Sequence, residues 1–198
     1  QLTDIGFAEI FFGSYPIIVE GDTEHAAFIS AITKEKHEMS GKVSIVRARG
    51  KAVLVPLIKM LNHFKADFGI VHDIDWPYRR DGSNNGSWTL NTIIRNEIIK
   101  CRNNGQKVYH RWSIPDFERF LVGEELGKDK PYTAFNRISR DEELKEKIQN
   151  LIINLFEGEC YDPDDFEPDD DFNAQLMEQL KIWAKNNGES DNVRVMGC

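Results

Sequence analysis

Long apolar runs are missing from this 198-residue chain. No segment approaches the roughly 18 consecutive apolar residues that a membrane-spanning helix needs. No positively charged leader precedes an apolar segment, as it would in a secretory signal peptide. Apolar residues still make up 40% of the chain, which is enough for one well-buried core and an accessory region. We therefore expect a soluble protein that does not contact membranes.

Cysteine is also scarce, and the three that occur lie far apart: Cys101, Cys160 and Cys198. Neither these cysteines nor the five histidines show the paired spacing of a zinc site. Few, widely separated cysteines are typical of proteins in a reducing compartment. The composition therefore predicts a cytoplasmic location.

A complete nucleotide-binding loop is absent. Gly50 and Lys51 stand between a predicted strand and a predicted helix, but the pattern Gly-x-x-x-x-Gly-Lys-Ser/Thr does not occur. We therefore expect no ATP hydrolysis by this chain. Lys51 keeps two interpretations, a phosphate contact or simply a lysine at the start of a helix.

What the sequence does contain is acidic residues directly after two apolar segments. The first segment runs into Glu20, with Glu24 four residues further on, and the second runs into Asp73 and Asp75. In open α/β sheets, ligands bind at the carboxyl ends of the strands. Clustered carboxylates resist joint ionisation unless a cation compensates, and oxygen ligands favour magnesium, manganese or calcium. If the second strand continues through Asp75, both aspartates face one side and can reach one ion.

Each acidic cluster also has a purely structural interpretation. Asp22 or Thr23 fits a helix N-cap, and Glu24 in a first helical turn is favoured by the helix dipole. Asp73 and Asp75 fit a turn before the break at Trp76-Pro77. Finding both clusters at the ends of apolar strands favours a shared site.

The apolar pattern alternates between strand and helix along the chain. Strands are predicted at 15–19, 43–47, 68–72 and 107–112. Helices are predicted at 23–38, 51–64, 89–104, 115–121 and 141–156. This alternation is typical of an α/β fold whose mostly parallel sheet carries helices on both faces. Right-handed crossovers then place the strand ends at one edge of the sheet.

The run Val19-Glu20-Gly21-Asp22-Thr23-Glu24, followed by Asp73-Ile74-Asp75, resembles the signature of Toprim domains. The closer likeness is to the C-terminal Toprim region of OLD (overcoming lysogenisation defect) family nucleases, and Arg49-Gly50-Lys51 and His72 also carry it. The resemblance implies a Rossmann-like Toprim sandwich over residues 1–140. Residues 141–198 would then be accessory helices, with an acidic linker at 157–171.

The resemblance implies a metal-dependent DNA endonuclease that holds two divalent cations, Mg²⁺ or Mn²⁺, with Ca²⁺ also able to bind. Glu20 and Glu24 would serve one ion, Asp73 would bridge, and Asp75 would serve the other. A pair of ions about 3.5 to 4 Å apart can clamp a phosphodiester and activate a water.

The resemblance implies two further residues beyond these four acids. One is an acid after the fourth strand, for which Asp116 and Glu118 are the candidates and Glu118 is slightly favoured. The other is a lysine that offsets charge in the transition state. Lys130 fits this role best and Lys128 is the alternative.

An irregular loop at 76–88 follows the second acidic cluster. Long loops beside a site are usually functional. Arg79 and Arg80 in this loop are interpreted either as contacts to DNA phosphates or as solvated side chains. Trp88 is predicted to pack against the protein.

The chain also lacks the positive charge expected of a DNA-binding protein, because its net charge is −8. Residues 157–171 hold nine acids and no base, so the remaining residues carry 24 acids against 25 bases. We interpret this acidic run as a solvated linker or as a mimic of DNA that covers a basic groove. Residues 172–187 after it show an amphipathic helical pattern. DNA affinity of this chain alone is expected to be weak.

A rival interpretation is a non-catalytic, metal-stabilised Toprim scaffold of the RecR type that binds DNA or partner proteins. Topoisomerase or primase chemistry would need parts that the sequence does not show. The chain begins at Gln1, so we expect a piece of a longer protein. The resemblance implies an N-terminal ATPase region outside this chain and a possible homodimer of the full-length protein.

Overall fold

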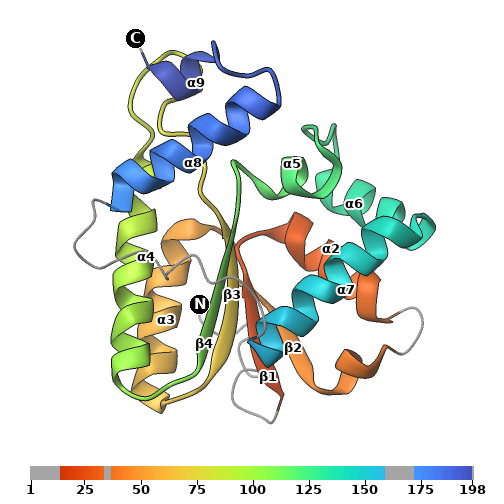
Figure 1. Cartoon of the computed structure of the whole chain (residues 1–198). Coiled ribbons are helices and arrows are strands. Elements are labelled where there is room, and N and C mark those ends of the chain that lie inside the picture. The colour runs from red at the N-terminus through yellow and green to blue at the C-terminus, as the bar shows by residue number, and fades with distance from the viewer. Residues whose placement is uncertain (1–13, 34–36, 159–171, 198) are drawn as a thin grey trace.

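A four-stranded, all-parallel sheet forms the centre of the protein (Figure 1). The computed structural model describes residues 14–33, 37–158 and 172–197. The strands are β1 (Tyr15–Val19), β2 (Val43–Arg47), β3 (Phe68–Asp73) and β4 (Val108–Ser113), in the order β2-β1-β3-β4. The predicted α/β fold with a mostly parallel sheet is therefore confirmed.

Helices cover both faces of this sheet (Figure 1). The helices α3 (Lys51–Phe64) and α4 (Gly86–Asn103) pack on one face, against Ile18 and Ile70. The helices α2 (Asp22–Thr33) and α7 (Glu142–Glu157) pack on the other face, against Ile17 and Val19. Within the described ranges, no helix has the length and apolarity to cross a membrane.

A glycine in β3 lets α7 approach the sheet closely. A Cβ atom on Gly69 would lie 3.2 Å from Cβ of Leu155 and 3.3 Å from its carbonyl oxygen. A larger residue there would push α7 away from the sheet. The division proposed at residue 140 remains a prediction, and α7, which lies beyond it, packs on the sheet.

The observed elements follow the predicted strands closely and the predicted helices less closely. Helix α4 begins at Gly86, three residues before the predicted start, because the Asn85 side chain caps it by accepting a hydrogen bond from the Ser87 N–H. The first predicted helix is described only as far as Thr33, and a short 3₁₀ helix, η1 (Glu38–Gly41), follows. After β4, the short predicted helix is α5 (Phe117–Val122).

The helix α6 (Lys130–Arg140) was not predicted, and this is a correction. Only Ala134 and Ile138 are buried in it, so its apolar pattern is too short to stand out in the sequence. Packing against α2 stabilises it instead, and Pro131 fits the first turn of a helix. The helix fixes the position of Lys130 at its start.

The C-terminal helices α8 (Phe172–Asn186) and α9 (Val193–Met196) form a separate small core. In this core Phe172, Leu176 and Leu180 pack with Trp76 and Trp88. The predicted packing role of Trp88 is confirmed, since only 8% of its surface is exposed. The acidic run at 157–171 lies outside the described residues apart from its first two positions.

Candidate active site

The predicted acids meet at the carboxyl edge of the sheet, because β1 and β3 are adjacent parallel strands. Glu20 directly follows β1, and its Oε2 accepts a hydrogen bond of 3.2 Å from the backbone N–H of Asp73, the last residue of β3. Glu24 lies in the first turn of α2 and is buried. A Cβ atom on Gly21 would lie 3.1 Å from Oε2 of Glu24, so the glycine leaves room for this carboxylate.

Asp75 reaches the site differently from the way the sequence suggests. The strand β3 ends at Asp73, and Asp75 has a left-handed backbone with φ of 65°. The Ile74 side chain between them is fully buried with the C-terminal core. The backbone N–H of Asp75 donates to the Pro115 carbonyl at 2.8 Å, which fixes the turn. A non-glycine residue in this conformation is uncommon, and such residues concentrate at functional sites.

Burial raises the pKa values of the carboxylates, and their charges raise one another's pKa values further. Burial raises the pKa of Asp73 well above its usual range, and the charges of Glu24, Glu20 and Asp75 raise it further. Burial raises the pKa of Glu20 to about 7, although the charge of Lys51 opposes this rise. Burial, with the charges of Glu20 and Glu118, also raises the pKa of Glu24 to about 7. The site therefore concentrates more negative charge than its own groups neutralise.

One oxygen of this site has no partner in the described part of the chain. Oδ1 of Asp73 is buried and accepts no hydrogen bond from any residue that the structure describes. A buried acceptor without a partner is costly. A cation beside Oδ1 would remove this cost. This unsatisfied oxygen and the all-oxygen donor set fit a hard divalent cation.

Within the described ranges, however, no group of three or more His, Cys, Asp or Glu side chains is close enough to hold a metal ion as it stands. A physical reason is that carboxylates without a cation repel one another. A second reason is that a lysine side chain already contacts Asp73 and Asp75. Metal binding would therefore require these side chains to move closer together.

That lysine is Lys51, the first residue of α3, which is only 5% exposed. Its Nζ donates to Oδ2 of Asp75 at 2.7 Å and to the Asp73 carbonyl oxygen at 2.5 Å. The preceding turn is tied to the site as well, since the Gly50 N–H donates to the Glu20 carbonyl at 2.9 Å. A DNA contact for Lys51 stays a prediction, and it would require the ammonium to leave Asp75.

The two candidate acids after β4 have different surroundings. Asp116 caps α5 by accepting from the Arg119 N–H at 3.0 Å, and its Oδ2 accepts from the Arg119 guanidinium at 2.6 Å. The charge of Glu118 helps to raise the pKa of Glu24, and the charge of Asp116 helps to raise the pKa of Asp73. Asp116 is thus held by its cap and ion pair, and this favours Glu118 as the further acid.

Lys130 lies beside this further acid. Its Nζ donates to Oε2 of Glu118 at 3.2 Å, whereas the Lys128 side chain is exposed. The sequence pattern around Lys130 shows no helical register, and α6 supplies that register. The structure therefore favours Lys130 over Lys128 as the lysine nearest the acids.

The predicted arginines lie on the loop that follows Asp75. Arg79 is exposed, and its backbone N–H donates to the Ser83 carbonyl at 2.8 Å, which closes a turn. The Arg80 guanidinium is 79% exposed and lies 3.6 Å from Oε2 of Glu125. None of these interactions joins Arg79 or Arg80 to the acid cluster, so DNA binding by the two arginines stays a prediction.

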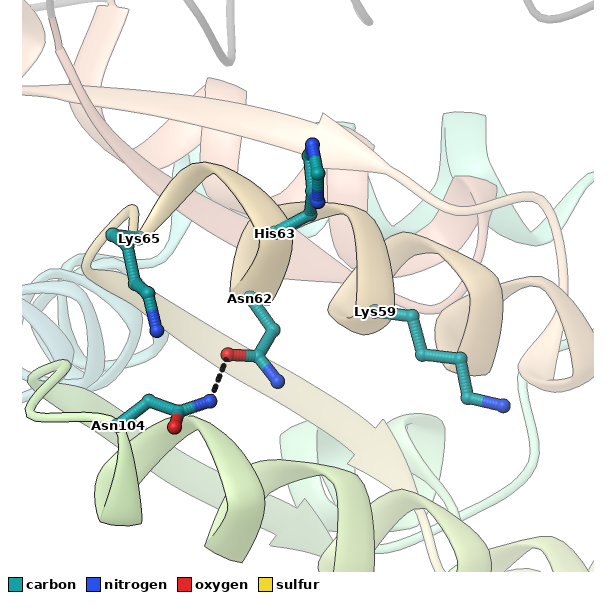
Figure 2. A pocket seen from close by; sticks show the side chains of 5 residues that line it. All are labelled: Lys59, Asn62, His63, Lys65 and Asn104. Carbon is teal, nitrogen blue, oxygen red and sulfur yellow. Dashed lines mark hydrogen bonds between the residues drawn. The ribbon is translucent and has the colours of Figure 1, made fainter.

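A basic surface hollow lies at the opposite edge of the sheet and contains none of the predicted site residues. Figure 2 shows its lining side chains: Lys59, Asn62, His63, Lys65 and Asn104. The Asn104 side chain donates to Oδ1 of Asn62 at 2.8 Å (Figure 2). Lys65 and Asn104 end the helices that precede β3 and β4, so this hollow is at the amino ends of those strands. The acid cluster at the carboxyl edge is therefore a separate place on the molecule.

We expect metal-free protein to become less stable as the pH rises from about 4.5 to above 7. Glu20 and Glu24 have pKa values of about 7 when folded against 4.5 as the ordinary value, so the folded state binds more protons in this window. By linkage, the free energy of unfolding then falls with rising pH, by about 3 kcal/mol for each of the two glutamates. Urea unfolding at pH 5 and pH 8 in EDTA measures this change.

The variant Glu24→Gln should reduce this pH dependence, whereas Glu38→Gln, an exposed glutamate of η1, should keep it. Saturating Mg²⁺ should reverse the slope, because metal binding requires ionised carboxylates. A free energy of unfolding that rises between pH 5 and pH 8 in EDTA would contradict the assignment of these pKa values.

Comparison with known protein families agrees with the geometry of this site. Residues 11–75 match the family model described as the overcoming lysogenization defect protein-like, TOPRIM domain. The matched segment contains Glu20, Glu24, Asp73 and Asp75, and it ends before α5 and α6. No curated protein matches the chain. OLD-like TOPRIM domains form a family of nucleases, and Toprim domains generally bind divalent metals.

Proposed function

We propose that this chain, which carries an OLD-like TOPRIM domain, cleaves or nicks DNA as a metal-dependent endonuclease. One observation carries this proposal above all others. The four acids Glu20, Glu24, Asp73 and Asp75 gather at the carboxyl edge of the sheet, where Oδ1 of Asp73 is buried without a partner among the described residues. Divalent cations would stabilise the ionised form of these carboxylates.

Two divalent cations, Mg²⁺ or Mn²⁺, would be held by these four acids together with Glu118 or Asp116. When bound, such ions supply an activated water and stabilise the leaving oxygen of a phosphodiester. Hydrogen bonds within the chain position two of these acids, Glu20 and Asp75. The hydrogen bond from the Asp73 N–H fixes Glu20, and the turn at Asp75 is fixed by the Pro115 carbonyl.

Lys130 would bring positive charge to the reacting phosphate. Its Nζ is 3.2 Å from Glu118, which in turn lies near Glu24. A cation at this place offsets the negative charge that develops on the phosphate oxygens in the transition state. The catalytic set is therefore Glu20, Asp73, Asp75 and Lys130.

A Toprim scaffold of the RecR type, which binds DNA or partner proteins without cutting, is the second candidate. The specific observation that favours it is that Lys51 already neutralises Asp75 at 2.7 Å, while the described acids are not close enough to hold a metal ion as they stand. For the endonuclease we also propose partners outside this chain, an N-terminal ATPase region and a homodimer of the full-length protein.

We expect the purified chain to nick supercoiled plasmid in Mg²⁺ or Mn²⁺ and not in EDTA. The variant Lys130→Gln should lower the rate by about a hundredfold to a thousandfold, because the charge on the phosphate is no longer offset. Lys128→Gln is the matched control, since it removes the same charge two residues away, and it should keep the rate. Agarose gel electrophoresis of the nicked circles measures both rates.

Absence of nicking with any of these ions would favour the scaffold, or an enzyme that works only with the ATPase region. Repeating the assay with that region attached separates the two. Equal rates for the two lysine variants would contradict the role given to Lys130 without contradicting cleavage itself.

A further inference from the structure

A single carboxylate outside the acid cluster contacts three cations from three different parts of the chain. Glu125 lies in the segment between α5 and α6. Its Oε2 is 3.6 Å from the Arg80 guanidinium and 3.5 Å from that of Arg119, and its Oε1 is 3.7 Å from Nζ of Lys130. Although burial opposes the effect, these three charges hold the pKa of Glu125 below its usual range.

A fourth cation comes from the C-terminal core. The Arg194 guanidinium of α9 lies over the Trp76 ring, with its central carbon 4.1 Å from the ring centre. The Arg119 guanidinium faces the same ring at 5.5 Å. Burial lowers the pKa of Arg194, and the nearby charges of Arg119 and Arg80 lower it further, although Glu125 and Glu189 oppose this. Four cations are thus gathered around one tryptophan and one glutamate.

The distances from the Glu125 carboxylate oxygens to the nitrogens of the three cations are long for ion pairs. All three are 3.5 Å or more, whereas Arg119 contacts Asp116 at 2.6 Å. Charge-assisted hydrogen bonds normally measure about 2.7 to 2.9 Å. The Glu125 carboxylate therefore pairs only loosely with the three cations, and its side chain is 43% exposed. A phosphate group, with more oxygens spread over a larger volume, can reach several guanidinium groups at once.

These cations adjoin the proposed active site. Lys130 contacts both Glu125 and Glu118, and Arg119 contacts both Glu125 and Asp116. An anion in the place of the Glu125 carboxylate would therefore lie one side chain away from the acid cluster.

We infer that Arg80, Arg119, Arg194 and Lys130 form a binding site for a backbone phosphate of DNA, which Glu125 occupies until the DNA displaces it. This inference rests on the proposed function and names the residues that hold the strand beside the cut. It also gives the C-terminal helix α9 a part in substrate binding, through Arg194.

The variant Glu125→Gln tests the inference, because it removes the resident charge and keeps the shape. We expect it to bind a short, fluorescently labelled DNA duplex about two to five times more tightly, as an exposed ion pair of ordinary strength no longer competes. Glu124→Gln is the matched control. It removes the same charge from the neighbouring residue, which pairs with Arg137 at 3.2 Å and not with the cation group. Fluorescence anisotropy in EDTA and in CaCl₂ gives the affinities.

Two further variants test the cations. Arg80→Gln and Arg194→Gln should each weaken binding and lower the slope of log affinity against log salt by about one, as expected for the loss of one phosphate contact. Equal affinities for Glu125→Gln and Glu124→Gln, or an unchanged salt slope in both arginine variants, would overturn the inference. Absence of DNA binding by every variant would overturn it as well.

Failure of the proposed function has a different signature. If the cleavage assay shows no nicking but Glu125→Gln tightens DNA binding, the phosphate site stands and the endonuclease proposal fails. If wild type nicks plasmid but Glu125→Gln behaves like Glu124→Gln, the endonuclease proposal stands and the phosphate site fails. Thermal unfolding of each variant checks that the fold is kept.

Discussion

Replacing Asp73 with Asn is expected to lower the rate of metal-dependent plasmid nicking by about a thousandfold or more. Oδ1 of Asp73 is buried, and the charges of Glu24, Glu20 and Asp75 all act on this carboxylate. Removing its charge would remove the group proposed to bridge both cations. Loss of metal-based stabilisation of several kcal/mol corresponds to a rate loss of this size.

The matched control for this change is Asp67→Asn, at the other end of the same strand. Asp67 is exposed, and its Oδ1 accepts from the Lys107 N–H at 2.7 Å, a role that asparagine can also fill. The control should nick at the wild-type rate. Equal rates for Asp73→Asn and Asp67→Asn would remove Asp73 from the mechanism.

Stability separates loss of chemistry from loss of fold in this experiment. Asp73→Asn removes a buried carboxylate whose Oδ1 has no partner among the described residues, so in EDTA its melting temperature should equal or exceed that of wild type. Mg²⁺ should raise the melting temperature of wild type and not of the variant. A variant that melts well below wild type in EDTA would indicate a damaged fold.

Replacing Lys51 with Met is expected to give the largest loss of stability in metal-free protein. The Lys51 ammonium is almost fully buried and contacts both Asp75 and the Asp73 carbonyl, so its removal leaves the acid cluster without its internal cation. Breaking a buried ion pair by removing one partner costs about 3 kcal/mol or more. For a chain of this length the melting temperature should fall by roughly 6 to 12 °C in EDTA.

A lysine on the same helix provides the control for this change. Lys59 is exposed and lies 3.9 Å from Glu97, so Lys59→Met should change the melting temperature by little. Saturating Mg²⁺ should restore more stability to Lys51→Met than it adds to wild type, because the metal then supplies the missing positive charge. If Lys51→Met were as stable as Lys59→Met in EDTA, Lys51 would not be the counter-ion of the acids.

The negative charge of the acid cluster is compensated differently in the metal-free and in the metal-bound protein. Without metal, Lys51 compensates part of the charge, and the acids Glu20 and Glu24 hold protons near neutral pH. With metal, the acids would release these protons and Lys51 would share Asp75 with an ion. The differing response of the Lys51 and Asp73 variants to Mg²⁺ distinguishes these two states.

Much of the fold could be predicted because its signals are local. Strands β1 and β2 have the predicted bounds, since each is a short apolar run between polar segments. Helix α6 could not be predicted, because only two of its residues are buried and its stability comes from α2. The position of Asp75 also differs from the one expected for a continuing strand, because β3 ends at Asp73. The chain turns at Ile74, and the Ile74 side chain is buried in the C-terminal core.

The sequence by itself determined the parallel α/β sheet and the acids at the ends of β1 and β3, because the alternation of apolar strands and helices, and acids directly after an apolar run, are visible among neighbouring residues. Only the tertiary structure decided which charges meet. Lys51 with Asp75, Lys130 with Glu118, and Arg80 and Arg119 with Glu125 join different segments of the chain. No local pattern encodes such pairs, since they depend on how helices and loops pack around the edge of the sheet.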